Sequence, residues 1–330
     1  MNKRSLLELI LVISICSVLV LFFLLQDAGQ EKEEIRVFYA GSLIIPFEEI
    51  ERQFEEMHPG VDLQMEGHGS IQVIRHVTEI RDSVDVVAVA DSSLIPDMMY
   101  PDYADSYIEF ATNEMVIAYT NDSIYGDEIT ERNWYEILKR PGVKFGFSNP
   151  MLDSCGYRTL MVVQLAEIYY EDPMIFEDLI GINFESGVVV DEGGGRYTII
   201  VPEIFEPDTQ KIIVRGGSVQ LLSLLEYAEI DYAFLYKSVA KQHGLRYVDL
   251  PTKIDLGSSH EVDTYSKVVV KLGFQRFSSV DIDRKGKPIL YGITVPLNSQ
   301  NQEIASEFEK FLISEEGLNI MEEAYHPTLN

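Results

Sequence analysis

The most constraining feature of the sequence is a β-branched, aromatic segment that runs directly into a small turn and then into a helical pattern. Residues 35–43 read IRVFYAGSL, and apolar side chains then recur at helical spacing from Pro46 to Phe54. A helix that follows a strand at once leaves its N-terminal amides pointing outward, where the helix dipole adds partial positive charge. The Gly41-Ser42 turn therefore predicts a place where an anion can bind.

A second copy of this arrangement lies farther along the chain. Residues 61–66 form a strand pattern that leads into a Gly-His-Gly-Ser turn ending at Ser70, and Ile71, Ile74 and Val77 then recur at helical spacing. A single turn of this kind more often only caps its helix, because Ser is a favoured N-cap residue. The repetition favours a binding role and predicts two turns that face one ligand.

The N-terminal segment, residues 1–30, is expected to lie outside the globular part. Lys3 and Arg4 precede an uncharged run at residues 9–25, and no small-residue cleavage site follows this run. The run is marginal for a full membrane span but long for a secretory signal. We expect an uncleaved membrane anchor, with the basic residues inside the cell and the body outside. Cys16 within the run leaves cleavage with lipidation as an alternative.

The charge balance excludes one large class of partner. The chain has 26 basic and 54 acidic residues, a net charge of −28, whereas nucleic-acid binding requires a basic surface. This charge also repels a small anion at long range. Screening limits that effect, because at about 0.1 M salt the Debye length is near 10 Å. Cys16 and Cys155 are the only cysteines in the sequence, and this pair provides no disulfide framework.

From residue 35 onward the pattern is that of an α/β protein. Short segments of continuous apolar or β-branched character alternate with helical patterns, as in parallel sheets that helices cover on both faces. A chain of 330 residues with 46% hydrophobic residues is long enough for two such lobes, each with its own core. The segments that predict strands are residues 35–39, 61–65, 84–90, 116–119, 145–147, 232–234 and 289–296. Residues 188–190 and 197–201 also predict a hairpin whose tip is Gly193-Gly194-Gly195.

The order of these patterns predicts that the chain crosses between two lobes twice. An extended run near residue 115 leads into a second lobe, and the chain crosses back after residue 237. We therefore expect lobe 1 to comprise residues 31–115 and 238–330, and lobe 2 to comprise residues 116–237. Two α/β lobes joined by two hinge crossings form a type II periplasmic-binding-protein-like fold, with the ligand in the cleft between the lobes.

Several motifs together resemble the archaeal tungstate/molybdate-binding proteins of ABC importers. The resemblance implies an extracellular solute-binding protein that captures tungstate or molybdate and delivers it to an ABC permease with its ATPase, and the N-terminal segment would anchor this protein in the cell membrane. It also implies a monomer that catalyses no reaction and needs no cofactor. The motifs are AGSL at 40–43, DVVAVADSSLIPDMM at 85–99, FATNEMVIAYTN at 110–121, NPMLDSCGYR at 149–158, IDYAFLYKSVAKQH at 230–243 and YGITV at 291–295.

The resemblance also implies which residues hold the oxyanion. In that family donors converge on the ligand from both lobes, and carboxylates join the metal atom itself and expand its tetrahedral coordination. Asp153, which precedes a predicted helix at residues 159–166, matches one such carboxylate and would be a ligand to W or Mo. The residues that match donors are Gly41, Ser42, Ser70, Ser154 and Cys155 (the last two through their backbone) and Tyr236.

The chemistry explains how an acid can line an anion pocket. A carboxylate aimed at the oxyanion oxygens is repelled, but one aimed between them can donate to a large, high-valent centre that favours oxygen ligands. Sulfur in sulfate cannot expand its coordination in this way, so Asp153 would also select against sulfate. Without the resemblance, an Asp at this position is more often an ordinary helix N-cap.

The chain departs from the family at one ligand. The family has a second ligating Glu in an Arg-Pro-Lys-Glu stretch, and the corresponding residues here are Arg215, Gly216, Gly217 and Ser218. Ser218 can donate a hydrogen bond to an oxyanion oxygen but is a poor metal ligand. Glu226 lies too far along the next helix to be a simple replacement. Coordination by two carboxylates is therefore in doubt.

Two other functions stay open from the sequence. Within the binding class, the ligand could be another tetrahedral oxyanion, sulfate or phosphate. In the enzyme class, Cys155 at a helix N-terminus could be the nucleophile of a hydrolase, because that environment favours the thiolate. No His lies close to Cys155 in the sequence, which favours a backbone or packing role for this residue.

Overall fold

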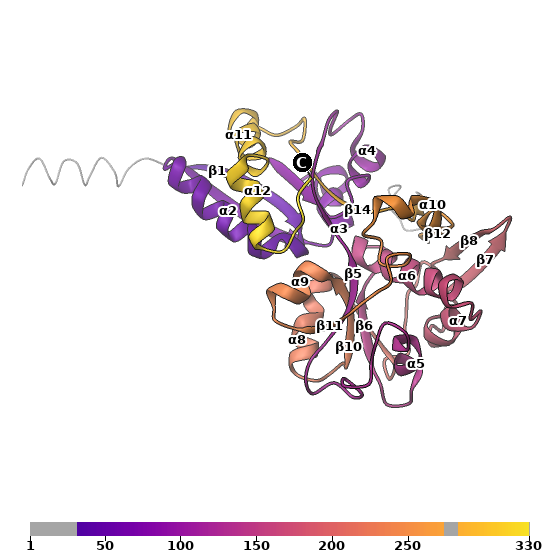
Figure 1. Ribbon diagram of the computed structural model, residues 1–330. Helices are drawn as coiled ribbons and strands as arrows, with labels where there is room; N and C mark the ends of the chain where they lie inside the picture. Colours follow the sequence, from indigo (N-terminus) through magenta and orange to yellow (C-terminus); the bar gives the residue numbers. More distant parts are fainter. Residues whose placement is uncertain (1–31, 274–282, 330) are drawn as a thin grey trace, which may run out of the picture.

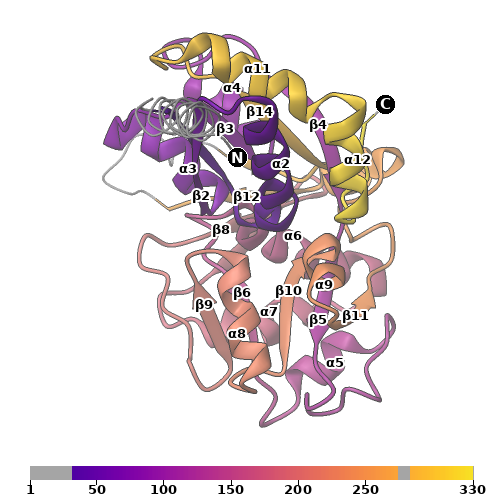
Figure 2. The ribbon, with the colours of Figure 1, turned by 90° about the vertical axis from the view of Figure 1, so that its left-hand side faces the viewer.

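The computed structural model describes residues 32–273 and 283–329, and these residues form two lobes that lie one above the other in Figure 2. Each lobe is built on a five-stranded sheet with helices against it (Figure 1). The predicted two-lobe α/β fold is therefore confirmed. A third sheet of four strands extends from the second lobe, and the sequence predicted only one hairpin of it.

The first sheet positions both predicted turns. β1 lies between β2 and β3, and its consecutive buried residues Val37, Phe38, Tyr39 and Ala40 are those of a central strand. In spatial order the strands are β2 (Val61–His68), β1 (Glu33–Ala40), β3 (Val86–Val89), β14 (Ile289–Thr294) and β4 (Ile108–Asn113). The helices of this lobe are α2 (Ile44–Met57), α3 (Ser70–Arg75), α4 (Leu94–Met99), α11 (Gln302–Leu312) and α12 (Glu315–Glu323).

The second sheet carries the other half of the cleft. Helix α6 lies on one face of this sheet and α8 and α9 lie on the other (Figure 1). In spatial order the strands are β11 (Arg246–Asp249), β5 (Met115–Tyr119), β10 (Tyr232–Tyr236), β6 (Phe145–Ser148) and β9 (Ile212–Arg215). The helices are α5 (Trp134–Lys139), α6 (Ser154–Tyr170), α7 (Ile175–Leu179), α8 (Leu221–Glu226) and α9 (Lys237–Gln242).

The third sheet packs near α6. The hairpin that the sequence predicts around Gly193-Gly194-Gly195 is confirmed, and Val189 and Ile200 on its two strands are 53% and 39% exposed. Its strands are β13 (Arg284–Lys285), β12 (Val268–Lys271), β8 (Arg196–Ile200) and β7 (Val189–Gly193), and the short helix α10 (Val262–Tyr265) precedes β12.

The two large sheets are mixed, with some antiparallel strands among the parallel ones that the pattern indicates. β1 is parallel to β2 and β3, but β14 is antiparallel to β3 and β4, and β5 is antiparallel to β10 and β11. β5 and β14 are the strands with which the chain enters a sheet after passing from the other lobe. Each of these two strands starts at the end of its sheet that faces the other lobe. It therefore runs opposite to the strands that follow a crossover helix.

The two crossings lie side by side beneath the first sheet. The first is short, because β4 ends at Asn113 and β5 begins at Met115. After the expected boundary at residue 237 the chain still adds β11 to the second sheet, and it joins the first sheet only with β14. The Met115 amide donates to the Asp255 carbonyl at 2.8 Å, which links the crossings. The exact lobe boundaries stay a prediction.

The predicted membrane anchor at residues 9–25 lies outside the described residues. Within residues 32–273 and 283–329, no helix combines the length and the apolar character that a membrane span requires.

Candidate functional site

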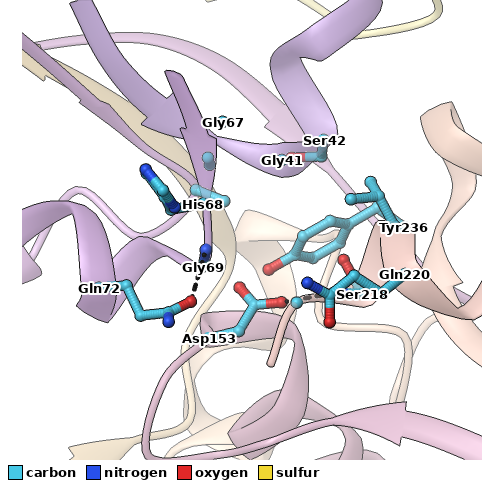
Figure 3. Close-up of a pocket in the computed structure, with 14 residues that line it drawn as sticks. Gly41, Ser42, Gly67, His68, Gly69, Gln72, Asp153, Ser218, Gln220 and Tyr236 are labelled. Carbon is cyan, nitrogen blue, oxygen red and sulfur yellow. Dashed lines mark hydrogen bonds between the residues drawn. The ribbon is translucent and has the colours of Figure 1, made fainter. Parts of the chain in front are cut away.

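A small cavity lies where the two lobes meet. Its volume is about 100 Å³, well below the roughly 300–1,000 Å³ of sites for drug-sized organic molecules. Both lobes contribute to its wall, and Figure 3 shows Asp153 and Tyr236 across from the Gly41 and Gly69 turns. Five of the residues that the sequence proposed for the site line this cavity: Gly41, Ser42, Asp153, Ser218 and Tyr236.

The first predicted turn opens onto the cavity. β1 ends at Ala40, a short 3₁₀ turn covers Gly41–Leu43, and α2 follows. The Ser42 hydroxyl lies 2.9 Å from the Tyr291 hydroxyl, which also accepts a hydrogen bond from Asn113 at 3.1 Å. A Cβ at Gly41 would lie 3.1 Å from a methyl group of Val219 in the second lobe. A larger residue at this position would therefore require Val219 to shift where the lobes approach each other.

The second predicted turn is occupied by the other lobe. Gly69 is the N-cap of α3, and the Ser70 amide donates to the Asp153 carboxylate at 3.4 Å. The amides of Ile71 and Gln72 donate to the Leu152 carbonyl at 3.1 and 3.2 Å. The N-terminus of α3 thus binds negatively charged and dipolar oxygens, as the sequence predicted for an anion cradle, but these oxygens belong to the protein.

Asp153 bridges the two lobes. It occupies the N-cap position of α6, but its side chain makes no capping hydrogen bond to that helix. Its Oδ2 instead accepts from the Ser218 amide at 3.0 Å, and its Oδ1 accepts from the Ser70 amide of the first lobe. Burial raises the pKa of Asp153, and the hydrogen bond from the Ser218 amide opposes this shift. The N-cap interpretation alone does not account for this carboxylate.

A chain of hydroxyl groups lies behind the cavity wall. Ser70 Oγ and Ser154 Oγ are 3.1 Å apart, and Ser154 Oγ is 3.0 Å from the Tyr236 hydroxyl. Ser70 and Ser154 are fully buried and contact each other across the lobes, but neither lines the cavity. Ser154 contacts the Tyr236 hydroxyl, and the contact between Ser70 and Ser154 joins the two lobes. Their proposed role as direct ligands of an oxyanion stays a prediction.

Cys155 is buried away from the cavity. Its thiol points toward the Phe234 carbonyl, with an Sγ to O distance of 3.6 Å, and the residue is not exposed. Burial raises the pKa of Cys155 well above its usual value, and the negative charge of Asp153 adds to this shift. These properties keep the thiol neutral and argue against a nucleophile at this position. They fit the packing role that the sequence favoured.

One carboxylate is present at the cavity. Among the described residues that line it, Asp153 is the only acidic one, and Ser218 occupies the position of the family's second Glu. Glu226 lies exposed at the end of α8 and does not reach the wall. The polar side chains that sequence reasoning missed at the wall are His68, Gln72 and Gln220.

These missed residues had a local signal. His68 and Gln72 belong to the Gly-His-Gly-Ser turn and the first turn of its helix, and the Gly69 amide donates to Gln72 Oε1 at 3.2 Å. Gln220 follows Ser218 in a 3₁₀ turn. Polar residues next to each small turn were therefore candidates for the cavity wall. They lie beside the start of a helical turn, whose N-terminal end borders the cavity.

Comparison with known proteins gives the family. Residues 35–325 match the family described as bacterial extracellular solute-binding protein. The molybdate/tungstate-binding protein WtpA of Pyrococcus abyssi is 42% identical over 310 residues, which cover 92% of this chain and 87% of that protein.

Two solved structures share the fold at 12% sequence identity. The periplasmic molybdate-binding protein of Azotobacter vinelandii has a TM-score of 0.58 over 90% of this chain and 100% of its own. The sulfate-binding protein SubI of Mycobacterium tuberculosis has a TM-score of 0.57 over 90% of this chain and 88% of its own. Because proteins named for different anions share this fold, the fold alone does not select the ligand. The matched family and the relative at 42% identity show that this chain belongs to the extracellular solute-binding proteins.

Proposed function

We propose that the protein binds tungstate or molybdate in the interlobe cavity and delivers it to an ABC permease with its ATPase. The relative at 42% identity is named for these two oxyanions, and it aligns with nearly the whole chain. The cavity supports the proposal because it has room for a small ion and polar groups from both lobes.

The observation that carries the proposal is the environment of Asp153. This carboxylate is 5% exposed at the cavity wall, and within the described residues it accepts hydrogen bonds from amides but pairs with no cationic side chain. A buried carboxylate without a counter-cation is costly. A W or Mo centre that accepts a carboxylate oxygen as a further ligand would offset this cost, whereas the sulfur of sulfate cannot.

The remaining contacts in this proposal are hydrogen bonds. Tyr236 and Ser218 would donate hydroxyl hydrogens to oxyanion oxygens from the second lobe, and Gly41 and Ser42 would donate from the first. Ser70, Ser154 and the Cys155 backbone would support this arrangement from behind the wall. Asp153 would then be the single protein ligand to the metal, one fewer carboxylate than the family pattern has.

The cellular setting belongs to the same proposal. The N-terminal segment would anchor the protein in the cell membrane, with its body extracellular, where a monomer exchanges its ligand with the permease. The protein would catalyse no reaction and hold no cofactor apart from its cargo. Lobe 1 (residues 31–115 and 238–330) and lobe 2 (residues 116–237) would close around the ligand at the two crossings.

Calorimetric titration of the purified protein with tungstate, molybdate, sulfate and phosphate tests this function. We expect nanomolar or tighter dissociation constants for tungstate and molybdate, corresponding to roughly −12 kcal/mol, and much weaker binding of the other two. Sulfate or phosphate binding as tight as tungstate binding would overturn the assignment and favour the alternative oxyanion.

A further inference from the structure

A buried arginine lies directly behind the cavity. Arg158 on α6 is 2% exposed and does not line the cavity. One of its guanidinium nitrogens, Nη1, donates to the Tyr236 hydroxyl at 2.6 Å and to the Ala90 carbonyl at 2.7 Å. Tyr236 belongs to the second lobe and Ala90 to the first, and both line the cavity. The guanidinium therefore contacts the wall from both sides of the cleft.

The hydrogen bond from Arg158 restricts the direction in which the Tyr236 hydroxyl can donate. A guanidinium can only donate, so the Tyr236 oxygen accepts from it and its hydrogen must point elsewhere. Two directions are available, toward Ser154 Oγ at 3.0 Å or toward the cavity that Tyr236 lines. Burial raises the pKa of Tyr236 well above its usual value, although Arg158 opposes this shift, so the hydroxyl keeps its hydrogen. An oxyanion in the cavity would thus meet a donor polarised by a positive charge.

The charge of Arg158 is only partly neutralised. The nearest carboxylate is Asp91, whose Oδ2 lies 3.7 Å from Arg158 Nη2. Asp91 also accepts from Tyr157 at 2.6 Å and pairs with Lys287 at 2.9 Å. One carboxylate therefore serves two cations, and Nη2 has no hydrogen-bond partner among the described residues. Arg158, Lys287 and Asp91 together carry one net positive charge behind the wall. This charge is opposite in sign to that of Asp153 at the cavity, in a chain whose overall charge is −28.

We propose that Arg158 is a positioning and selectivity residue, which acts through the Tyr236 hydroxyl to make the cavity prefer doubly over singly charged tetrahedral oxyanions. This inference rests on the proposed oxyanion function. The attraction between a fixed cation and a bound anion scales with the charge of the anion. A role confined to packing would affect both kinds of anion equally.

The test compares tungstate, a dianion, with perrhenate, a tetrahedral monoanion of similar shape. Their dissociation constants are measured on the full-length protein, with perrhenate in competition against tungstate. We expect Arg158→Gln to weaken tungstate binding by a factor about ten times larger than it weakens perrhenate binding. Arg158→Lys, which keeps the charge, should retain most of the original ratio. Arg246→Gln removes a partly exposed cation of the second lobe that pairs with Asp127, and it should leave the ratio unchanged.

Equal losses for the two anions in Arg158→Gln would overturn the proposal and leave Arg158 a packing role. If circular dichroism shows that Arg158→Gln does not fold, the same ratio of tungstate to perrhenate affinity is measured on Tyr236→Phe. It keeps the cation but removes the hydroxyl, and the tungstate preference should fall at least about threefold. An unchanged preference in Tyr236→Phe would overturn the proposal. Failure of the unmodified protein to bind tungstate would instead refute the proposed function.

Discussion

The Gly41-Ser42 turn and the Gly69-Ser70 turn share one sequence pattern but meet different surroundings. Both follow a strand of the first sheet and open a helix. The Ser42 hydroxyl contacts the Tyr291 hydroxyl, which also bonds to Asn113 at the first crossing. The turn that contains Ser42 borders the cavity. Ser70 is completely buried, and the amides that open its helix bind Leu152 and Asp153 of the other lobe.

The difference teaches what a local motif can specify. A strand, a small turn and a helix determine that donors point out of the end of the sheet. They do not determine which acceptor those donors will meet. In the first turn the donors border a space for a ligand, whereas in the second they bind protein oxygens and hold the lobes together. We infer that the second turn acts as a closure contact, with Asp153 shared between closure and ligand.

Removal of Asp153 should have the largest effect on tungstate binding. The same carboxylate bonds to both lobes and is the proposed ligand to the metal. We expect Asp153→Ala to weaken tungstate binding at least about a hundredfold, since each hydrogen bond to a charged group contributes about 1.5–3 kcal/mol. Residual oxyanion binding through the neutral donors should remain, and discrimination against sulfate should fall. Calorimetry with tungstate and sulfate measures both effects.

Glu226→Ala is the matched control for this variant, because it removes the same charge from an exposed position on α8. Its affinities should equal those of the unmodified protein. If Asp153→Ala kept the original ratio of tungstate to sulfate affinity, Asp153 would be a closure contact alone. X-ray absorption on the bound protein gives an independent view, since two carboxylate oxygens at the metal would show that another acid completes the coordination.

The second turn can be blocked by a single added methyl group at Gly69, which lines the cavity. A Cβ at Gly69 would lie 2.4 Å from the Leu152 carbonyl oxygen and 2.9 Å from Asp153 Cβ, although the Gly69 backbone suits any residue (φ −66°, ψ 143°). Gly69→Ala should leave each lobe folded but hold the lobes apart. We expect about tenfold to hundredfold weaker tungstate binding, because overpacking costs about 1–3 kcal/mol.

Small-angle scattering reports the closure directly. At saturating tungstate, Gly69→Ala should show a larger radius of gyration than the unmodified protein. Gly217→Ala is the control at the same cleft, because the nearest atom to its Cβ would be 3.9 Å away. A Gly69→Ala protein that closes normally would mean that the contact between α3 and Leu152 does not govern closure.

The two serines should differ in their contribution to folding. Ser70 Oγ accepts from the Ala90 amide at 3.1 Å, so Ser70→Ala leaves a buried amide without a partner and should lower the free energy of unfolding by about 1–3 kcal/mol. Ser42→Ala leaves the Tyr291 hydroxyl with its Asn113 partner and should cost only about 0.5–1.5 kcal/mol. Urea denaturation measures both. Equal costs would remove the distinction between a ligand turn and a closure turn.

The parts of this molecule that follow from the sequence are those with local causes. The buried strands ending at Ala40 and at Val89, the helix after Asp153 and the small turns all have their cause in neighbouring residues, and each is present in the structure. The contact of Leu152 with α3 has no local cause, because it depends on how two lobes meet. The hairpin of β7 and β8 was predicted from its glycines, but the sheet that it joins was not, and β11 extends the second sheet beyond Lys237, where the sequence pattern predicted the return crossing.

The smallest expected effect is the pH dependence that Asp153 gives to the second turn. Burial raises the pKa of Asp153 above its ordinary 3.8, with the Ser218 amide opposing the shift. Between 3.8 and the raised value, the folded protein therefore binds more protons at this carboxyl than the unfolded chain does. The stability that this proton binding contributes is fully present below the unfolded-state pKa and is lost as the pH rises through the folded-state pKa.

Urea denaturation of the ligand-free protein and of Asp153→Asn, from about pH 4 to about pH 7, isolates this contribution from that of the other acids. The unfolding free energy of the unmodified protein minus that of the variant should decrease as the pH rises. Ser42→Ala keeps Asp153 and should follow the unmodified protein. A difference that is flat or increases with pH would mean that the hydrogen bonds from Ser70 and Ser218 outweigh burial. Asp153 would then be a stably ionised bridge rather than a carboxylate held at a cost until a metal centre binds it.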